Sequence, residues 1–307
     1  MASPRVAVIV LNWNGRDDTL RCLASLRTVD YPDLDVVVVD NGSRDDSVAA
    51  IAKGFPEFDL VRLARNCGYA EGNNVGIRHA LRRQPEFVFV LNNDTEVDPT
   101  CVRKLVETAA RLPEAGAFGP KTYRLGTRSV LYSVGLDFNW LTGHVSYVGW
   151  GELDNRRHDR EREFDVINGH ALFLRATTID KVGLFDPEFF AYNEETDYCL
   201  RIARAGFRLL YVPSAIVFHK GESTTIGLLR QYLICRNHVL CMRRNGSPPQ
   251  LAAFYAYYFL MDLPRQLVGC ALRGRWQHMR AVLLAVGWNL GLRDNPFERS
   301  LRRGADS

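Results

Sequence analysis

Asparagine and aspartate side chains follow four short apolar runs in the first third of the chain. They are Asn12 and Asn14 after the first run, Asp40 after the second, Asn66 after the third, and Asn92, Asn93 and Asp94 after the fourth. Both residue types favour turns, which explains such a residue after any single run. Their repetition after four runs favours a polar site for a ligand or for a divalent cation such as Mg²⁺ or Mn²⁺.

The sequence lacks the common glycine-rich phosphate loops. No G-x-G-x-x-G motif follows the first apolar run, and no G-x-x-x-x-G-K-[ST] motif occurs in the chain, which disfavours a dinucleotide site and a P-loop. A nucleotide diphosphate bound at these residues needs another positive charge, and a divalent cation held by a carboxylate is the simplest source. Asp94 is the candidate carboxylate, with Asn92 and Asn93 beside it.

Three acids, Glu194, Glu195 and Asp197, stand at the start of a segment with helical periodicity. One interpretation is structural, because acids stabilise a helix N-terminus and Asp197 lies four residues before Arg201, the spacing of a helical ion pair. The other is catalytic, because adjacent carboxylates raise the pKa of one of them toward the range of a general base. The residues alone leave both interpretations open.

The elements that position these residues are strands and helices in alternation. Over the first 120 residues, short β-branched runs alternate with helix-period segments, which predicts an α/β fold with a mostly parallel sheet flanked by helices. We expect strands over 6–11, 35–39, 59–63, 87–91 and 115–119, and helices over 17–27, 43–53, 70–83 and 100–112. Later in the chain we expect a buried strand over 166–167 and 171–174, a helix over 194–205 and a strand over 208–212. Ligands bind beyond the carboxyl ends of such strands, so the Asn and Asp groups should meet at one edge.

The chain of 307 residues, 47% hydrophobic and 24% charged, is in the range of globular proteins. Residues 230–307 contain 12 arginines, no lysine and four acids, a balance of +8, whereas residues 1–229 carry −4. This amphipathic segment interleaves aromatic residues with arginine, which suits an anionic membrane surface better than nucleic acid. A packed C-terminal helical bundle is an equally good interpretation. Arg230 and Arg236 could instead contact phosphate.

The cysteines and the apolar segments bear on localisation. Seven cysteines without a C-x-x-C pair suggest neither disulfides nor a zinc knuckle, which favours a reducing compartment. The first apolar run, over 6–11, is too short for a signal peptide, and no uncharged stretch reaches the roughly 20 residues of a membrane span. We therefore expect a cytoplasmic protein, which could lie peripherally on the inner face of the plasma membrane.

Four segments, 8–15, 37–43, 66–74 and 91–95, resemble family 2 glycosyltransferases of the GT-A fold. The resemblance extends over about residues 5–245, and the bacterial rhamnosyltransferase group is the most similar branch. It implies a GT-A nucleotide-sugar-binding and catalytic domain over 1–222. Residues 223–307 then form the basic, aromatic helical tail.

The resemblance also implies roles for the residues on the nucleotide side. Asp40 matches the carboxylate that holds the base, and Asn66, Gly68 and Tyr69 match the loop that closes over the nucleotide. Asp94 matches the last residue of the D-x-D metal motif, whose first acid is replaced by Asn92. The histidine of Val217-Phe218-His219 matches the late metal ligand of the family.

On the reacting side, Glu195 matches the position of the catalytic base, where the family usually has Asp. Glu194 and Asp197 would orient the base and the acceptor, or cap the helix. Gly169 and His170 occupy the turn that the family places on the acceptor side.

The resulting prediction is an inverting glycosyltransferase that uses a nucleotide-diphosphate sugar, dTDP-rhamnose or a UDP-sugar, and a glycan or lipid-linked acceptor. L-Rhamnose is the sugar that the resemblance favours. The nucleotide would lie across Asn12, Asp40 and Asn66, and no nucleic acid is expected as a partner. Two alternatives stay open: a nucleotidyltransferase, and a nucleotide-sugar-binding subunit with weak catalysis.

Overall fold

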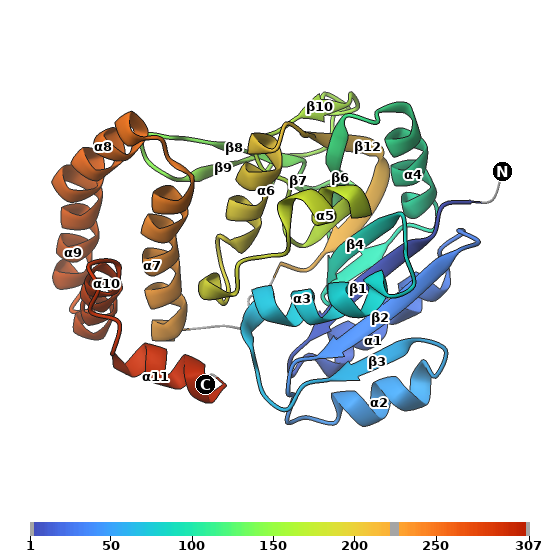
Figure 1. The fold of residues 1–307 in the computed structure, drawn as a ribbon, viewed down its shortest axis with the longest axis horizontal. Coiled ribbons are helices and arrows are strands. Elements are labelled where there is room, and N and C mark those ends of the chain that lie inside the picture. Colours follow the sequence, from blue (N-terminus) through green and yellow to red (C-terminus); the bar gives the residue numbers. More distant parts are fainter. Residues whose placement is uncertain (1–2, 222–226, 305–307) are drawn as a thin grey trace.

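The computed structural model describes residues 3–221 and 227–304 and forms an α/β body with a layer of C-terminal helices beside it (Figure 1). The strands are β1 Val6–Asn12, β2 Leu34–Asp40, β3 Asp59–Arg62, β4 Phe87–Asn92, β5 Thr95–Val97, β6 Ala115–Arg124, β7 Leu131–Ser133, β8 Gly135–Phe138, β9 Val145–Val148, β10 Arg162–Glu163, β11 Ala171–Arg175 and β12 Arg208–His219. The helices are α1 Arg16–Arg27, α2 Ser47–Gly54, α3 Gly68–Leu81, α4 Cys101–Arg111, α5 Ala176–Val182, η1 Pro187–Phe189, α6 Glu194–Arg204, α7 Gly227–Asn245, α8 Pro248–Tyr257, η2 Tyr258–Asp262, α9 Leu263–Leu272, α10 Trp276–Asn289 and α11 Pro296–Arg303.

The first half of the sheet is parallel. Strands β4, β1, β2 and β3 are neighbours in that order, and the register pairs Asn12 with Asp40 and Leu11 with Asn92. Alternate residues of β1 enter two different hydrophobic clusters, with Val8 on one face and Ile9 on the other, both fully buried. Burial on both faces explains the unbroken apolar run, and the parallel register brings the predicted polar residues to one edge.

The second half of the sheet mixes directions. Strand β11 runs antiparallel between β4 and β6, and β12 runs parallel to β6 but antiparallel to β5. The predicted strand over 208–212 is too short, because β12 continues past an irregularity after Val212 and ends at His219. Its register places His219 opposite Thr95, next to the Asn-Asn-Asp turn that follows β4.

The C-terminal helices pack against the α/β body. Helix α7 lies between α6 and the pair α8 and α9 (Figure 1). Asn237 of α7 donates from Nδ2 to the backbone carbonyl oxygens of Phe189, Ala191 and Tyr192, and α10 packs on α7. The packed-bundle interpretation therefore holds for α7 and α10. The predicted domain boundary at residue 222 lies outside the described residues.

The described helices include none that combines the length and apolar character of a membrane span. The seven cysteines all lie in the described ranges and form no disulfide bond with one another.

Candidate active site

A cavity of about 380 Å³ opens at the carboxyl edge of the parallel strands. Of the predicted site residues, it is lined by Asn66, Gly68, Tyr69, Asn92, Asn93, Asp94, Gly169, His170, Glu194, Glu195 and His219. These residues come from sequence positions far apart, and the sheet and the start of α6 bring them together. Asn12, Asn14, Asp40 and Asp197 are outside this lining.

Asp94 and His219 are in direct contact. The distance from His219 Nε2 to Asp94 Oδ1 is 3.1 Å, and the backbone N–H of Gly221 donates to Asp94 Oδ2 at 3.2 Å. Burial opposes ionisation of Asp94, but the hydrogen bond and charge of His219 outweigh it and lower the pKa of the carboxyl. Asp94 is therefore ionised at neutral pH, in the state that binds a cation.

Two more atoms beside Asp94 could act as metal ligands. Asn92 Oδ1 and His219 Nδ1 are buried, and neither has a hydrogen-bond partner among the residues that the structure describes. Buried polar atoms are ordinarily paired, so each such atom calls for an explanation. An ionised carboxylate, an imidazole and an amide oxygen together fit a divalent cation such as Mn²⁺ or Mg²⁺.

His170 belongs to the same aromatic group as His219. The two rings stack at 4.2 Å, and Tyr132 meets both edge-on. Burial, and then the charge of His219, lower the pKa of His170 well below its usual value, and Thr122 Oγ1 lies 2.9 Å from His170 Nε2. His170 is thus a neutral, fixed wall of the cavity. Its proposed contact with the acceptor stays a prediction.

The loop before α3 is held by asparagine side chains. Asn66 Oδ1 accepts hydrogen bonds from Asn41 Nδ2 at 3.0 Å and from the Gly68 N–H at 2.8 Å. Asn41 also accepts from the Cys67 N–H at 2.9 Å. Asn41 lines the cavity, although sequence reasoning singled out its neighbour Asp40. Asn41 could have been singled out from the sequence, because it directly follows Asp40 in the same strand-end motif.

Asn12 and Asp40 are buried and do not line the cavity. They are 0% and 2% exposed, and Asn12 Nδ2 donates to Asp40 Oδ1 at 2.9 Å and to Ser43 Oγ at 3.0 Å. Asn14 is exposed, and its Oδ1 accepts from the Arg44 N–H at 2.8 Å. The structure therefore gives these three residues a role in holding the strand-end loops. Their predicted contacts with the nucleotide stay predictions, since none of the three lines this cavity.

The two glutamates enter the cavity from the start of α6. Phe190, Tyr192 and Asn193 all have positive φ angles, and this tight turn directs the first helical residues inward. Burial raises the pKa of both Glu194 and Glu195, and the charge of Glu195 raises that of Glu194 further. Glu194 Oε2 has no hydrogen-bond partner within the described part of the chain.

Asp197 points elsewhere. Its carboxylate accepts from Arg201 Nε at 2.8 Å and from Asn245 Nδ2 at 2.8 Å, and it is 2% exposed. The structural interpretation of the acid cluster, an ion pair four residues apart, thus applies to Asp197. Its predicted catalytic role is not supported by this position, because a side chain one turn further along α6 faces α7.

Arg230 and Arg236 also differ in whether they reach the cavity. Arg230 lines the cavity and lies 5.8 Å from the ring centre of Tyr192. Arg236 is 1% exposed, pairs with Glu298 at 2.6 Å and donates to the backbone oxygen of Phe189 at 2.8 Å, so it holds α7 to its neighbours. Of the two, Arg230 is the one placed to meet a phosphate.

A mixed sheet flanked by helices, with an acidic, histidine-containing cavity at the carboxyl edge of its parallel strands, makes the chain an α/β protein, and its structural neighbours give it the GT-A fold. Solved structures share this fold. GalNAc-T7 with UDP, GalNAc and Mn²⁺ matches with a TM-score of 0.62 at 15% identity, over 78% of this chain and 48% of the other. The mannosyltransferase PcManGT from Pyrobaculum calidifontis with GDP-Man and Mn²⁺ matches with a TM-score of 0.55 at 19% identity, over 99% and 85%.

The model of Glycosyl transferase family 2 matches residues 7–176, more than half of the chain, so the chain belongs to this family and is a glycosyltransferase. A curated relative is the N-acetylglucosaminyl-diphospho-decaprenol L-rhamnosyltransferase of Mycobacterium tuberculosis (strain ATCC 25618 / H37Rv), 28% identical over 71% of this chain and 76% of the relative. An N-acetylglucosaminyltransferase of Rhizobium meliloti (strain 1021) is 27% identical over 75% and 54%.

Proposed function

We propose that this chain is an inverting glycosyltransferase in which Glu195 is the general base and a nucleotide-diphosphate sugar is the donor. The observation that carries the proposal is the shared cavity, which holds the ionised Asp94 with His219 and also two glutamates of raised pKa. Asp94 and His219 suit a diphosphate with its cation. The two glutamates suit removal of a proton from an attacking hydroxyl.

The reaction needs one base and one displacement. Glu195 takes the proton of the acceptor hydroxyl as that oxygen forms a bond to the anomeric carbon. The bond from this carbon to the diphosphate oxygen breaks, and its electron pair leaves with the nucleoside diphosphate. Attack from the face opposite the leaving group inverts the configuration. His170 and Gly169 form the wall next to Glu195, which supports an acceptor-side role for this turn.

Asp94 and His219, with Asn92 beside them, are the residues that would hold Mg²⁺ or Mn²⁺. When bound, such an ion stabilises the charge that grows on the departing diphosphate. Arg230, in the same cavity, adds a fixed positive charge for the phosphates. Asn66, Gly68 and Tyr69 would contact the nucleotide, and Tyr69 is held by a 2.8 Å hydrogen bond from its hydroxyl to the Gly169 carbonyl.

For the substrates, the proposal follows the relative from Mycobacterium tuberculosis. That relative is named as an L-rhamnosyltransferase acting on N-acetylglucosaminyl-diphospho-decaprenol. We therefore propose dTDP-rhamnose as donor, with a UDP-sugar as the competing choice, and a hydroxyl of a lipid-linked glycan as acceptor. A cell-surface polysaccharide is then the product class.

A lipid-linked acceptor would require the enzyme to reach a membrane, and we propose peripheral attachment to the cytoplasmic face. Helices η2, α9 and α10 expose a group of large apolar side chains: Phe259, Leu260, Met261, Val268, Leu272 and Trp276. Arg265, Arg273 and Arg275 are exposed among them. Exposed apolar side chains mixed with arginines fit an anionic lipid surface.

Donor turnover tests the proposed function. Purified protein is incubated with dTDP-rhamnose, UDP-N-acetylglucosamine or GDP-mannose, and release of the nucleoside diphosphate is followed with Mn²⁺ and with a chelator. We expect Mn²⁺-dependent turnover that is fastest with dTDP-rhamnose, and an Asp94→Asn variant that loses the Mn²⁺ response. Turnover with GDP-mannose alone would refute the donor, and turnover unaffected by the chelator would refute the cation site.

A further inference from the structure

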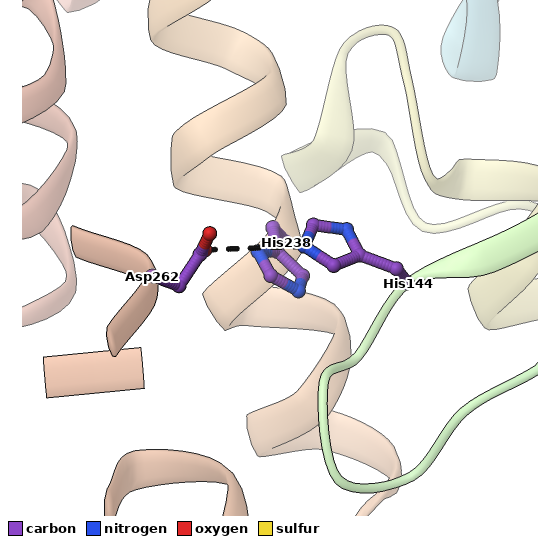
Figure 2. A group of neighbouring side chains, drawn as sticks. All are labelled: His144, His238 and Asp262. Carbon is purple, nitrogen blue, oxygen red and sulfur yellow. Dashed lines mark ion pairs between the residues drawn. The ribbon is translucent and has the colours of Figure 1, made fainter. Parts of the chain in front are cut away.

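A second group of potential metal ligands lies outside the active site. His144 follows β8, His238 is on α7 and Asp262 ends η2, and one ligand atom from each lies within 4.8 Å of the others. Figure 2 shows the three side chains pointing toward one another from the hairpin loop, α7 and η2. They face a separate cavity of about 590 Å³, which none of the proposed catalytic residues lines.

The two histidine rings lie against each other. Their rings stack at 4.3 Å with an interplanar angle of 25°. The distance from His238 Nε2 to the backbone oxygen of Thr142 is 2.8 Å, and a carbonyl can only accept, so Nε2 carries a proton. Nδ1 then keeps the lone pair that a metal needs.

The carboxylate is also oriented by a neighbour. Gln266 Nε2 donates to Asp262 Oδ2 at 2.9 Å, and His144 Nε2 lies 3.9 Å from the same oxygen. Protein metal sites have such outer partners for their ligands: a carbonyl on the far side of a histidine, and a hydrogen bond to the carboxylate. Here Thr142 and Gln266 occupy these two positions.

Two features of the backbone serve this arrangement. Gly143 has a φ of +69°, and a Cβ atom there would lie 2.5 Å from His238 Nε2, so only glycine lets the hairpin loop reach His238. Residues Tyr258–Asp262 form a π-helix between α8 and α9, and Asp262 is buried within it. Single turns of π-helix occur frequently at functional sites.

We propose that His144, His238 and Asp262 form a zinc-type site, distinct from the cation site at Asp94. Two imidazoles and one carboxylate are a recognised ligand set for Zn²⁺ and similar transition metals, with a fourth position for water. Cys235 borders the same cavity, but burial raises the pKa of its thiol to about 11, which leaves it protonated and a poor ligand.

The site connects the catalytic part to the C-terminal helices. The β8–β9 hairpin extends from the sheet toward α7 and α8 (Figure 1), and Tyr147 of β9 lines the active-site cavity. A metal held by the loop, α7 and η2 would fix this hairpin, and with it one wall of the active site. The ion would thus have a structural or regulatory role, which does not depend on which sugar the donor carries.

Zinc titration tests the proposal. Full-length protein freed of metal by chelation is titrated calorimetrically with ZnCl₂, as wild type and as the Asp94→Asn, His144→Ala, Asp262→Asn and His278→Ala variants. We expect about one equivalent that the Asp94→Asn and His278→Ala variants retain. His144→Ala and Asp262→Asn should weaken it by at least about tenfold. His278, on α10, serves as the matched histidine control because it does not line the cavity.

Thermal unfolding gives a second readout that needs no enzyme activity. Zinc should raise the Tm of wild type and of His278→Ala, because binding to the folded state alone stabilises it. It should raise the Tm of His144→Ala by less, because only the cation site at Asp94 remains; the His144 side chain is 53% exposed and therefore tolerates truncation. Equal zinc affinity and an equal Tm shift in His144→Ala and wild type would overturn the site.

Discussion

Glu194 and Glu195 are adjacent in the sequence but differ in how readily they ionise. Burial raises the pKa of both carboxyls, and the pKa of Glu194 is raised further by the charge of Glu195. The two carboxyls do not ionise independently, so one of them keeps its proton above the pH at which the other loses its own. In the proposed mechanism Glu195 is the base, and Glu194 is the neutral hydrogen-bonding group beside it.

The variant Glu194→Gln tests this division of roles. Because the folded state raises the pKa of Glu194, its contribution to stability is complete below the unfolded pKa near 4.5 and is lost as the pH rises through the folded pKa. Glutamine cannot ionise, so the variant should lose less stability than wild type as the pH rises above about 4.5, measured as Tm. Its turnover should fall by less than about tenfold. An identical pH dependence of Tm in both proteins would contradict the assignment.

At the residue scale, the residue types and their order in the sequence predicted the Asp94 and His219 pair and the two glutamates of the cavity. The roles predicted for Asp197, Asn12 and Asp40 stay predictions, and these residues lie outside the cavity lining because a side chain's direction depends on the helix face or on the neighbouring strand. The second histidine cluster was missed for another reason. His144, His238 and Asp262 are separated by long stretches and share no motif spacing.

At the scale of elements, the start of α3 and the turn before α6 depend on each other. The Phe190 carbonyl accepts a hydrogen bond from the Ala70 N–H at 3.1 Å. Gly68 has a φ of +85°, and a Cβ atom at this position would lie 2.5 Å from the Phe190 oxygen. The nucleotide-side loop and the turn that carries the glutamates thus approach as closely as backbones allow.

Replacing Gly68 by alanine should separate these two segments. Gly126 has a φ of +83°, and a Cβ atom there would meet no other atom within 4 Å, so it is the matched control for the backbone penalty. We expect Gly68→Ala to lower the free energy of unfolding by about 1–3 kcal/mol more than Gly126→Ala, the usual range for overpacking. It should also weaken nucleotide binding. Equal losses in urea unfolding would show that the close approach has no energetic importance.

The periodic pattern predicted the parallel half of the sheet because each strand there is followed by its own helix. The buried strand expected over 171–174 is present as β11, but the pattern did not predict that it enters the sheet antiparallel between β4 and β6. The pattern also predicted that β12 ends at Val212, before its actual end at His219. The break at Val212-Pro213-Ser214 resembles a strand end in the sequence, but the strand continues beyond it to His219.

At the scale of the whole molecule, the basic C-terminal segment has two different surfaces. Helices α7 and α10 bury Tyr232, Leu233, Ala281 and Val282 in a common cluster. Helix α9 contains no fully buried residue, and with η2 it presents exposed apolar side chains and arginines. The proposed membrane contact is therefore confined to η2, α9 and the start of α10.

Vesicle binding tests this surface without deleting any packed helix. The Leu260→Asp/Leu272→Asp variant changes two leucines that are 75% and 83% exposed. We expect wild type to sediment with vesicles containing anionic lipid, and the double variant to lose at least about tenfold in partitioning, because each change removes apolar burial and adds a repelled charge. Leu153→Asp, at a leucine that is 71% exposed before β10, should bind as wild type. A double variant that sediments normally would exclude this surface.

The central claim, that Glu195 is the base of a glycosyl transfer, is tested most directly by Glu195→Gln. Turnover of the donor and affinity for the free nucleoside diphosphate are measured together, with Glu57→Gln as an exposed control. We predict that Glu195→Gln loses about 10²–10⁴-fold in kcat, the usual contribution of a general base, and keeps its nucleotide affinity. Near-normal turnover in this variant would contradict the account.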